Sequence, residues 1–168
     1  MRQVVISDID GVLTTEPMFN PPNVGNEIPI SMSHRFLTNQ KMNGAEIIYV
    51  TGRSNAYRKE TKRWLKHHKF PDGQLLMRVE DKDPEVKGEA ERIFRWDKYY
   101  QKKCATVIDI VDDVIRERGA VMYIDDDKIL TNCMKIKYKL NGEHPEVEII
   151  NPYEKNDIFY FYGAEEGQ

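Results

Sequence analysis

The sequence has little cysteine, with Cys104 and Cys133 as its two cysteines among 168 residues. Two cysteines are too few for a disulfide framework, and these two lack the paired spacing of a zinc site. We therefore expect both to be reduced thiols that pack in the interior. A reducing cytoplasm fits this expectation.

Long apolar runs are absent too, and none approaches the roughly 20 residues that a membrane span requires. The opening MRQVVISDID lacks the basic and then apolar pattern of a secretion signal. Positive charge is not in excess either, since 28 acidic residues outnumber 25 basic ones. This balance excludes a dedicated nucleic-acid coat protein but allows a local basic surface. We expect a soluble, cytoplasmic protein.

Hydrophobic residues make up 40% of the chain, which is enough to build a core. Short β-branched runs alternate with longer stretches that have helical spacing. That alternation predicts an α/β fold, a Rossmann-like three-layer domain with a central parallel sheet of five strands. We expect a single domain, 1–168. The predicted strands are 3–7, 46–50, 74–78, 105–109 and 120–124, and the predicted helices are 33–43, 55–68, 84–101 and 112–118.

The C-terminal part of the chain follows a different pattern. Residues 134–140 and 146–150 flank Asn141-Gly142, a dipeptide that favours a two-residue hairpin turn. We therefore expect a core over residues 1–125, a β-hairpin extension over 134–150, and a tail over 151–168.

Carboxylates and a hydroxyl end the predicted strands. Asp8 and Asp10 follow the first strand, Thr51 follows the second and Asp109 ends the fourth. Because the carboxyl ends of parallel strands form the ligand crevice, these side chains should meet. Phosphoryl transfer through a carboxylate requires a nucleophile, a proton donor and groups that screen the phosphate, and this set can supply them.

The segments DIDGVLT at residues 8–14 and YVTGR at 49–53, with a later lysine and a further strand-end aspartate, resemble the haloacid dehalogenase superfamily of phosphatases. The resemblance covers about residues 1–125. It implies that Asp8 is the nucleophile, Asp10 the general acid and base, and Thr51 a hydroxyl donor to the phosphate.

The resemblance also implies a lysine that neutralises the phosphate. Lys87 lies 22 residues before Asp109 and is the expected lysine, with Lys62 as the weaker candidate. Mg²⁺ is the implied cofactor, and the expected metal residues are Asp8, Asp10, Asp109 and Asp113. A rival placement uses Asp125, Asp126 and Asp127 after the last predicted strand. It is disfavoured because it lies too far beyond Lys87 for one helix and one strand.

Between these motifs, RKETKRWLKHH, LLMR and KDPEVKGEAERIF resemble the phosphatase domain of polynucleotide kinase/phosphatase enzymes. We expect no kinase half, since these 168 residues contain no G-x-x-x-x-G-K-[ST] loop. The resemblance implies a nucleic-acid or nucleotide phosphate as substrate. From the TGR pattern and the strand-end position of Arg78, we expect Gly52, Arg53 and Arg78 to contact it. Residues 53–69 carry seven Lys or Arg against one Glu, which is either a solvated helix face or a phosphate-tracking surface.

The short spacing between the motifs leaves no room for a large cap, and an uncapped site admits bulky substrates. We therefore predict a Mg²⁺-dependent phosphomonoester hydrolase that acts through an aspartyl-phosphate, with polynucleotide 3′-phosphate ends as substrate. A nucleoside monophosphate phosphatase and a non-catalytic nucleic-acid or nucleotide binder of the same fold are the alternatives.

Overall fold

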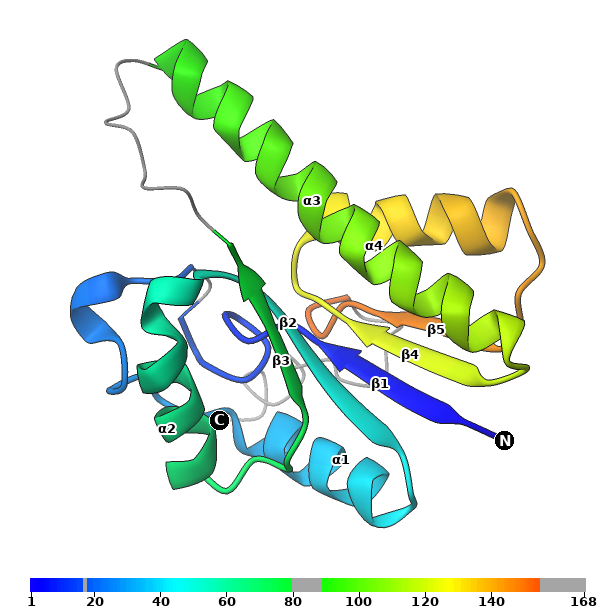
Figure 1. Cartoon of the computed structure of the whole chain (residues 1–168), viewed down its shortest axis with the longest axis horizontal. Coiled ribbons are helices and arrows are strands. Elements are labelled where there is room, and N and C mark those ends of the chain that lie inside the picture. The colour runs from blue at the N-terminus through cyan, green and yellow to red at the C-terminus, as the bar shows by residue number, and fades with distance from the viewer. Residues whose placement is uncertain (17, 80–88, 155–168) are drawn as a thin grey trace.

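A sheet of five parallel strands, in the order β3-β2-β1-β4-β5, forms the centre of the molecule (Figure 1). The structure is a computed structural model that describes residues 1–16, 18–79 and 89–154, the last range with side chains from residue 100 onward. The strands are β1 (Gln3–Ser7), β2 (Glu46–Ser54), β3 (Gln74–Arg78), β4 (Ala120–Ile124) and β5 (Val147–Ile150). The predicted α/β class and five-stranded parallel sheet are confirmed.

Helices cover both faces of this sheet (Figure 1). One face carries α1 (Ser31–Met42) and α2 (Arg58–His67), and the other carries α3 (Glu89–Arg116) and α4 (Lys128–Lys135). Short turns complete the elements: 3-10 turns at Pro21–Asn23 and Asn55–Tyr57, and a π-helical turn, Ile136–Leu140, that continues α4.

Alternation along the strands explains the two apolar layers. Val5 of β1 packs with Ile47 of β2 and Trp64 of α2, whereas the neighbouring Val4 packs with Ile48 of β2 on the α3 side. Because successive strand residues point to opposite faces, a β-branched run buried on both faces supports helices on each side.

The predicted strand at 105–109 is wrong, because this segment lies inside α3. The same helix includes residues 89–101 and 112–116 of the two neighbouring predicted helices. Val107, Val111 and Val114 recur at a spacing of three and four residues, and all three are fully buried against the sheet. The helical periodicity of these valines outweighs their β-propensity.

The predicted C-terminal β-hairpin is also wrong. Its first arm lies in α4 and the π-helical turn, where Leu130, Met134 and Tyr138 are buried at a spacing of four residues. Its second arm is β5, which pairs with β4 in parallel rather than with a hairpin partner. α4 therefore serves as the crossover between two parallel strands.

Cys104 of α3 and Cys133 of α4 form a disulfide, so the expectation of two reduced thiols is wrong for this structure. The fold brings together two cysteines that lie 29 residues apart because α4 packs on α3. Among the helices that the structure describes, none has the length and apolar character required to cross a bilayer.

Candidate active site at the carboxyl ends of the strands

Asp8 lies directly after β1 and is 7% exposed. Its backbone N–H donates to the carbonyl of Ile124 at 2.9 Å, which joins the carboxyl ends of β1 and β4. Asp125 and Asp126 follow β4, so the chain brings them to the same edge of the sheet. One carboxylate oxygen from each of these three aspartates lies within 4.8 Å of the other two.

Lys103 approaches this group from α3. Its Nζ lies 2.9 Å from Asp8 Oδ1 and 2.8 Å from Asp125 Oδ2, and its side chain is 5% exposed. Asp125 also accepts hydrogen bonds from the Tyr123 hydroxyl at 2.6 Å and from the Asp127 N–H at 2.9 Å. Lys103 is therefore a buried cation that bridges two carboxylates.

Burial leaves the negative charge of this group poorly compensated. Burial first, and then the neighbouring carboxylates, raise the pKa of Asp8 well above its usual range, against the opposing effect of Lys103. Burial and then the charge of Asp125 raise the pKa of Asp126 to about 7. A further cation between these side chains would offset that cost.

The donor set fits Mg²⁺, since carboxylate oxygens are the ligands that this hard cation prefers. Asp8, Asp125 and Asp126 could hold the ion. Gly11 faces the same place: its φ is +75°, and a Cβ added there would collide with the carboxylate of Asp126. The backbone at Gly11 therefore approaches the acidic group more closely than a side chain would permit.

Asp10 and Arg53 form the second part of the site. Arg53 Nε donates to Asp10 Oδ2 at 3.1 Å, and Arg53 Nη2 donates to Oδ1 at 2.7 Å. The Arg53 side chain is completely buried, and Glu27 Oε1 lies 2.9 Å from the same Nη2. Both carboxylate oxygens of Asp10 thus face a guanidinium, and the three-carboxylate group does not include Asp10.

An irregularity in β2 turns Arg53 toward Asp10. The pairing of β2 with β3 shifts between Thr51 and Ser54, so Gly52 and Arg53 lie at a bulge, a feature that re-aims side chains at sheet ends. Thr51 is 4% exposed, and its Oγ1 accepts from the Arg53 N–H at 3.2 Å. TGR therefore lies beside DID, as the sequence predicted from strand order.

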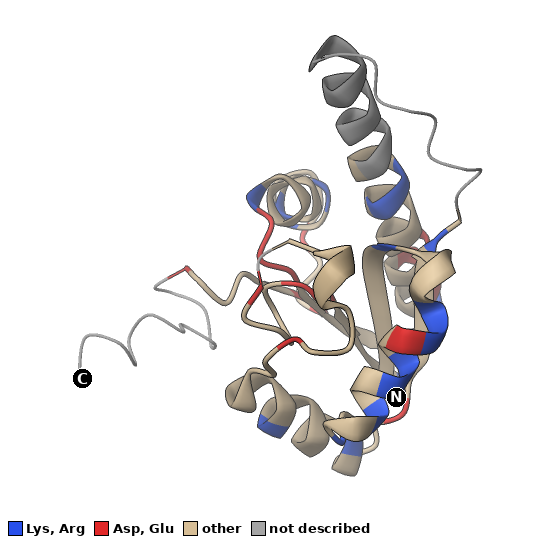
Figure 2. Ribbon diagram, turned by 90° about the vertical axis from the view of Figure 1, so that its left-hand side faces the viewer, with Lys and Arg blue, Asp and Glu red and all other residues tan. Residues whose placement is uncertain are grey.

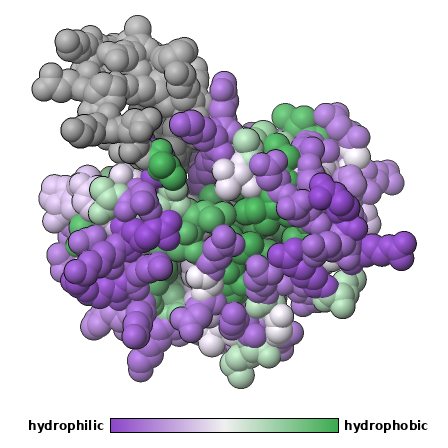
Figure 3. Space-filling model, viewed as in Figure 1, coloured by the Kyte–Doolittle hydropathy of each residue, from purple (hydrophilic) through white to green (hydrophobic). Residues whose placement is uncertain are grey.

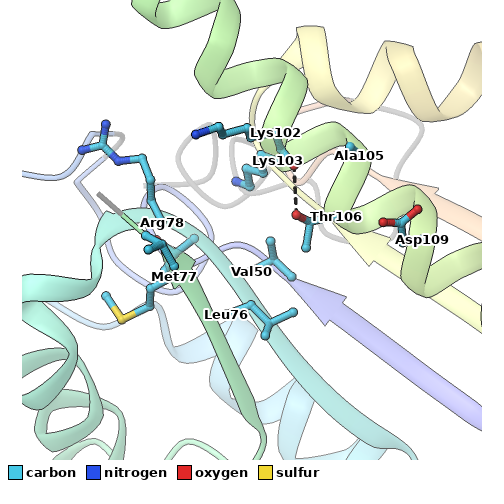
Figure 4. A pocket seen from close by; sticks show the side chains of 11 residues that line it. Val50, Leu76, Met77, Arg78, Lys102, Lys103, Ala105, Thr106 and Asp109 are labelled. Carbon is cyan, nitrogen blue, oxygen red and sulfur yellow. Dashed lines mark hydrogen bonds between the residues drawn. The ribbon is translucent and has the colours of Figure 1, made fainter. Parts of the chain in front are cut away.

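A pocket of about 420 Å³ opens next to these residues, between β2, β3 and α3 (Figure 4). Thr51 and Lys103 line it, together with the apolar side chains of Val50 and Leu76. Arg78 of β3 and Lys102 of α3 extend to the same side of it in Figure 4. Figure 3 shows apolar side chains gathered in the middle of this face, over the sheet beside α3.

The remaining predicted residues are placed elsewhere. Asp109 is exposed on α3 and lines the pocket, and Asp113 is exposed and pairs with Arg116 at 2.8 Å. Neither belongs to the acidic group around Asp8, because the strand that was to carry Asp109 there is a helix. Lys87 lies outside the described residues. Lys62 is exposed on α2.

The sequence interpretation missed Lys103 and preferred Asp109 to Asp125. A signal was present: Lys103 lies 22 positions before Asp125, the same spacing that favoured Lys87 with Asp109. Asp125 and Asp126 also directly follow a strand that was predicted with its observed bounds, 120–124. If 89–116 is read as one helix, Asp109 no longer ends a strand and is no longer a candidate metal residue. Lys103 and Asp125 then remain as the lysine and aspartate of the site.

Charge around the site is unevenly distributed (Figure 2). Acidic residues follow the central strands, whereas Lys and Arg residues gather on α2. The exposed basic residues of this helix, which we call the α2 basic cluster, are Lys59, Lys62, Arg63 and Lys66.

Solved structures with similar folds include two from the Pnkp1/Rnl/Hen1 complex, one of them described as an RNA repair complex. Sequence identities are 21% and 20% and TM-scores 0.55 and 0.57, over 81% and 89% of this chain. The matches cover 40% and 45% of those chains, so this chain spans less than half of their length.

The HAD domain of effector protein Lem4 from Legionella pneumophila matches over 98% of this chain and 93% of that domain. Its identity is 13% and its TM-score 0.57. Identities this low establish the fold alone, and the fold is HAD-like.

Sequence comparison identifies the family. Comparison with curated proteins gives no match. A family model described as PITM 1-3, LNS2 domain, matches residues 5–103, which is more than half of the chain. The chain therefore belongs to the PITM 1-3, LNS2 domain family.

Proposed function

We propose that this chain is a Mg²⁺-dependent phosphomonoester hydrolase that acts through an aspartyl-phosphate on Asp8. The observation that carries the proposal is the buried group in which Asp8 lies with Asp125 and Asp126 and is contacted by Lys103. A carboxylate nucleophile needs cations around it to receive a phosphate dianion, and this group combines a fixed ammonium with a place for a metal ion.

The chain's own residues account for both chemical steps. An oxygen of Asp8 attacks phosphorus, and the bond between phosphorus and the leaving oxygen breaks as Asp10 gives that oxygen a proton. Water then attacks the phosphorus of the aspartyl-phosphate while Asp10 takes back a proton, which releases phosphate and regenerates Asp8. Lys103 holds Asp8 in place, and the hydroxyl of Thr51 donates to a phosphate oxygen.

Mg²⁺ bound by Asp8, Asp125 and Asp126 would supply positive charge for the phosphate and keep Asp8 ionised. In this assignment Asp125 and Asp126 replace Asp109 and Asp113 as metal residues, and Lys103 takes the part expected of Lys87. Asp10 acts through its proton and not as a side-chain ligand.

We further propose that the substrate is a phosphate at the 3′ end of a polynucleotide. Three observations support this: the fold similarity to chains of an RNA repair complex, the α2 basic cluster, and the pocket beside Thr51, where Arg78 and Lys102 could contact a second phosphate. Among the described residues between β1 and α1, the one element is the 3-10 turn Pro21–Asn23, which is too small to act as a cap.

A nucleoside monophosphate is the second candidate, because a pocket of about 420 Å³ is large enough for one nucleoside. The two candidates differ in what lies beyond the terminal nucleotide. Only a polynucleotide reaches the α2 basic cluster.

Hydrolysis of an aryl phosphate with and without Mg²⁺, by the wild type and by Asp8→Asn, tests the chemistry. We expect activity that requires Mg²⁺ and a loss of more than about 10³-fold in the variant. Full Mg²⁺-dependent activity in Asp8→Asn would refute the mechanism, and a wild type inactive on every phosphate would favour a binding protein.

A panel of substrates tests the specificity. Oligonucleotides with a 3′-phosphate or a 5′-phosphate are compared with free nucleoside 3′-monophosphates, using kcat/KM as the measure. We expect the 3′-phosphorylated oligonucleotide to be hydrolysed fastest. A preference for the free nucleotide would replace the polynucleotide assignment with the second candidate.

A further inference from the structure

Glu27 is a buried carboxylate that the proposed reaction does not use. It lies in the loop between β1 and α1 and is 3% exposed. Placing a carboxylate out of water is costly unless its charge is paired and its oxygens accept hydrogen bonds. The partners of Glu27 therefore indicate what it does.

These partners tie Glu27 to its own loop and to two elements, α2 and β2. Its Oε2 accepts from the N–H of Gly25 at 2.7 Å, and its backbone carbonyl accepts from the indole N–H of Trp64, on α2, at 2.9 Å. Its Oε1 lies 2.9 Å from Nη2 of Arg53, at the end of β2. The carboxylate of Glu27 is thus fixed from behind and directed at Arg53.

Arg53 in turn contacts Asp10, the proton donor of the proposed reaction. Its Nε and Nη2 contact the two oxygens of Asp10, so a single guanidinium sets the plane of that carboxylate. Two further contacts confine the guanidinium: Nη1 donates to the hydroxyl of Thr61 at 3.4 Å, and the ring of Phe19 lies 4.8 Å from the guanidinium carbon.

Charge explains why the second acid is needed. With Asp10 as its one carboxylate partner, Arg53 would form a neutral pair, and an arriving phosphate would compete with Asp10 for the guanidinium. Glu27 contacts Nη2 from its own fixed position and retains Arg53 at the end of β2. Arg53 then stays in contact with both oxygens of Asp10.

We propose that Glu27 is a positioning residue, which holds Arg53 so that the guanidinium fixes the carboxylate of Asp10 beside the nucleophile. This inference rests on the proposed function, since it assumes that Asp10 delivers a proton to the leaving group. It assigns Glu27 a part in proton delivery without contact to substrate, and it predicts which substrates depend on that residue.

The leaving group distinguishes this role from a structural one. An aryl oxide is a good leaving group that needs little protonation, whereas a sugar alkoxide leaves only if it is protonated as the bond breaks. A badly oriented Asp10 should therefore slow the hydrolysis of a nucleoside 3′-monophosphate while it spares p-nitrophenyl phosphate. Loss of folded protein would slow both to the same extent.

The test is Glu27→Gln, which retains an oxygen for the N–H of Gly25 but removes the charge that faces Arg53. We expect kcat for the nucleoside 3′-monophosphate to fall by about tenfold or more, and kcat for p-nitrophenyl phosphate to change less than about threefold, with KM nearly constant. The control is Glu46→Gln, which removes an exposed glutamate that pairs with Arg2. It should leave the ratio of the two rates unchanged.

Equal losses on both esters in folded Glu27→Gln would overturn the proposal. If Glu27→Gln does not fold, Arg53→Lys is the second variant. It retains the positive charge but lacks the two donors that hold both oxygens of Asp10, so the same selective loss is expected, and its absence would likewise overturn the proposal. A wild type inactive on both esters would refute the proposed function itself, which separates the two failures.

Discussion

At the scale of single residues, the site depends on two buried cations that face an excess of carboxylates. Lys103 bridges Asp8 and Asp125, and Arg53 contacts Asp10 and Glu27. Removing one member of such a group leaves the others buried without a partner, which costs several kcal/mol. Removing one carboxylate from the group Asp8, Asp125 and Asp126 should instead stabilise the metal-free protein, because it relieves repulsion between like charges.

Lys103 and its neighbour Lys102 form a matched pair, because the first is buried and the second is exposed. Lys103→Met should lower the free energy of unfolding by about 3 kcal/mol in the absence of metal. Lys102→Met should change it by less than about 0.5 kcal/mol. Urea unfolding monitored by circular dichroism measures both, and equal values for the two variants would contradict the bridging contact.

Asp126→Asn tests the crowding of negative charge. The amide preserves the shape of the side chain and removes one like charge beside Asp125, so the melting temperature without metal should stay equal to that of the wild type or rise. The stabilisation by Mg²⁺ should shrink, since one ligand is lost. Asp113→Asn, on the exposed side of α3, is the control. If Mg²⁺ raises the melting temperature of Asp126→Asn as much as that of the wild type, Asp126 is not a ligand of the metal.

At the scale of elements, α3 decides which residues reach the site. A continuous helix buries Val107 and Val111 and presents Lys103 to Asp8, while Asp109 stays exposed. The helix thus supplies the bridging cation and forms one wall of the pocket. A strand over 105–109, as the sequence predicted, would have carried Asp109 to the sheet edge instead.

Two substitutions in α3 separate these arrangements. Val111→Ala removes buried methyl groups and should lower the free energy of unfolding by about 2 kcal/mol, whereas Asp109→Ala should change it by less than about 0.5 kcal/mol. Asp109→Ala should also retain the full rise in melting temperature on addition of Mg²⁺. Loss of that rise would restore Asp109 to the metal site.

The same elements show how far the sequence could predict this protein. β1, β3 and β4 were predicted with their observed bounds. β1 and β4 are short β-branched runs followed by aspartate, and β3 is a short, mainly apolar run that follows the turn at residues 71–73. The error at 105–109 arose because Val107 and Ile108 favour strands locally, and only packing against the sheet decides between the two structures. Asn141-Gly142 misled in the same way, since it follows a π-helical turn here.

The candidate site was predictable only where a motif lies in one contiguous segment. DIDGVLT identified Asp8 and Asp10, and TGR identified Thr51 and Arg53, which do lie beside them. Lys103 and Glu27 are single residues in segments with no motif of their own. Their importance depends on which carboxylate each meets, and that follows from tertiary structure.

At the scale of the whole molecule, charge is divided between an acidic centre and the basic surface of α2 (Figure 2). The chain has a formal net charge of −3, so a polyanion would be attracted by local clusters and not by the molecule as a whole. We therefore expect the basic surface of α2 to affect the binding of polynucleotide substrates and not that of small phosphate esters.

Neutralising the α2 basic cluster should weaken polynucleotide binding alone. The triple variant Lys62→Gln, Arg63→Gln and Lys66→Gln should raise KM for a 3′-phosphorylated oligonucleotide and make it less dependent on salt, because up to three phosphate contacts are lost. The kcat for an aryl phosphate should stay constant. An unchanged salt dependence would show that α2 is a solvated face that substrate does not contact.

The central claim is that phosphate is transferred to Asp8. The most direct measurement is mass spectrometry of the protein after acid quenching during turnover with Mg²⁺ and a phosphate ester, followed by peptide mapping. We expect a phosphoryl group on the peptide that contains Asp8, and no such group in Asp8→Asn. Turnover with no phosphorylated Asp8 at any quench time, together with an active Asp8→Asn variant, would contradict it.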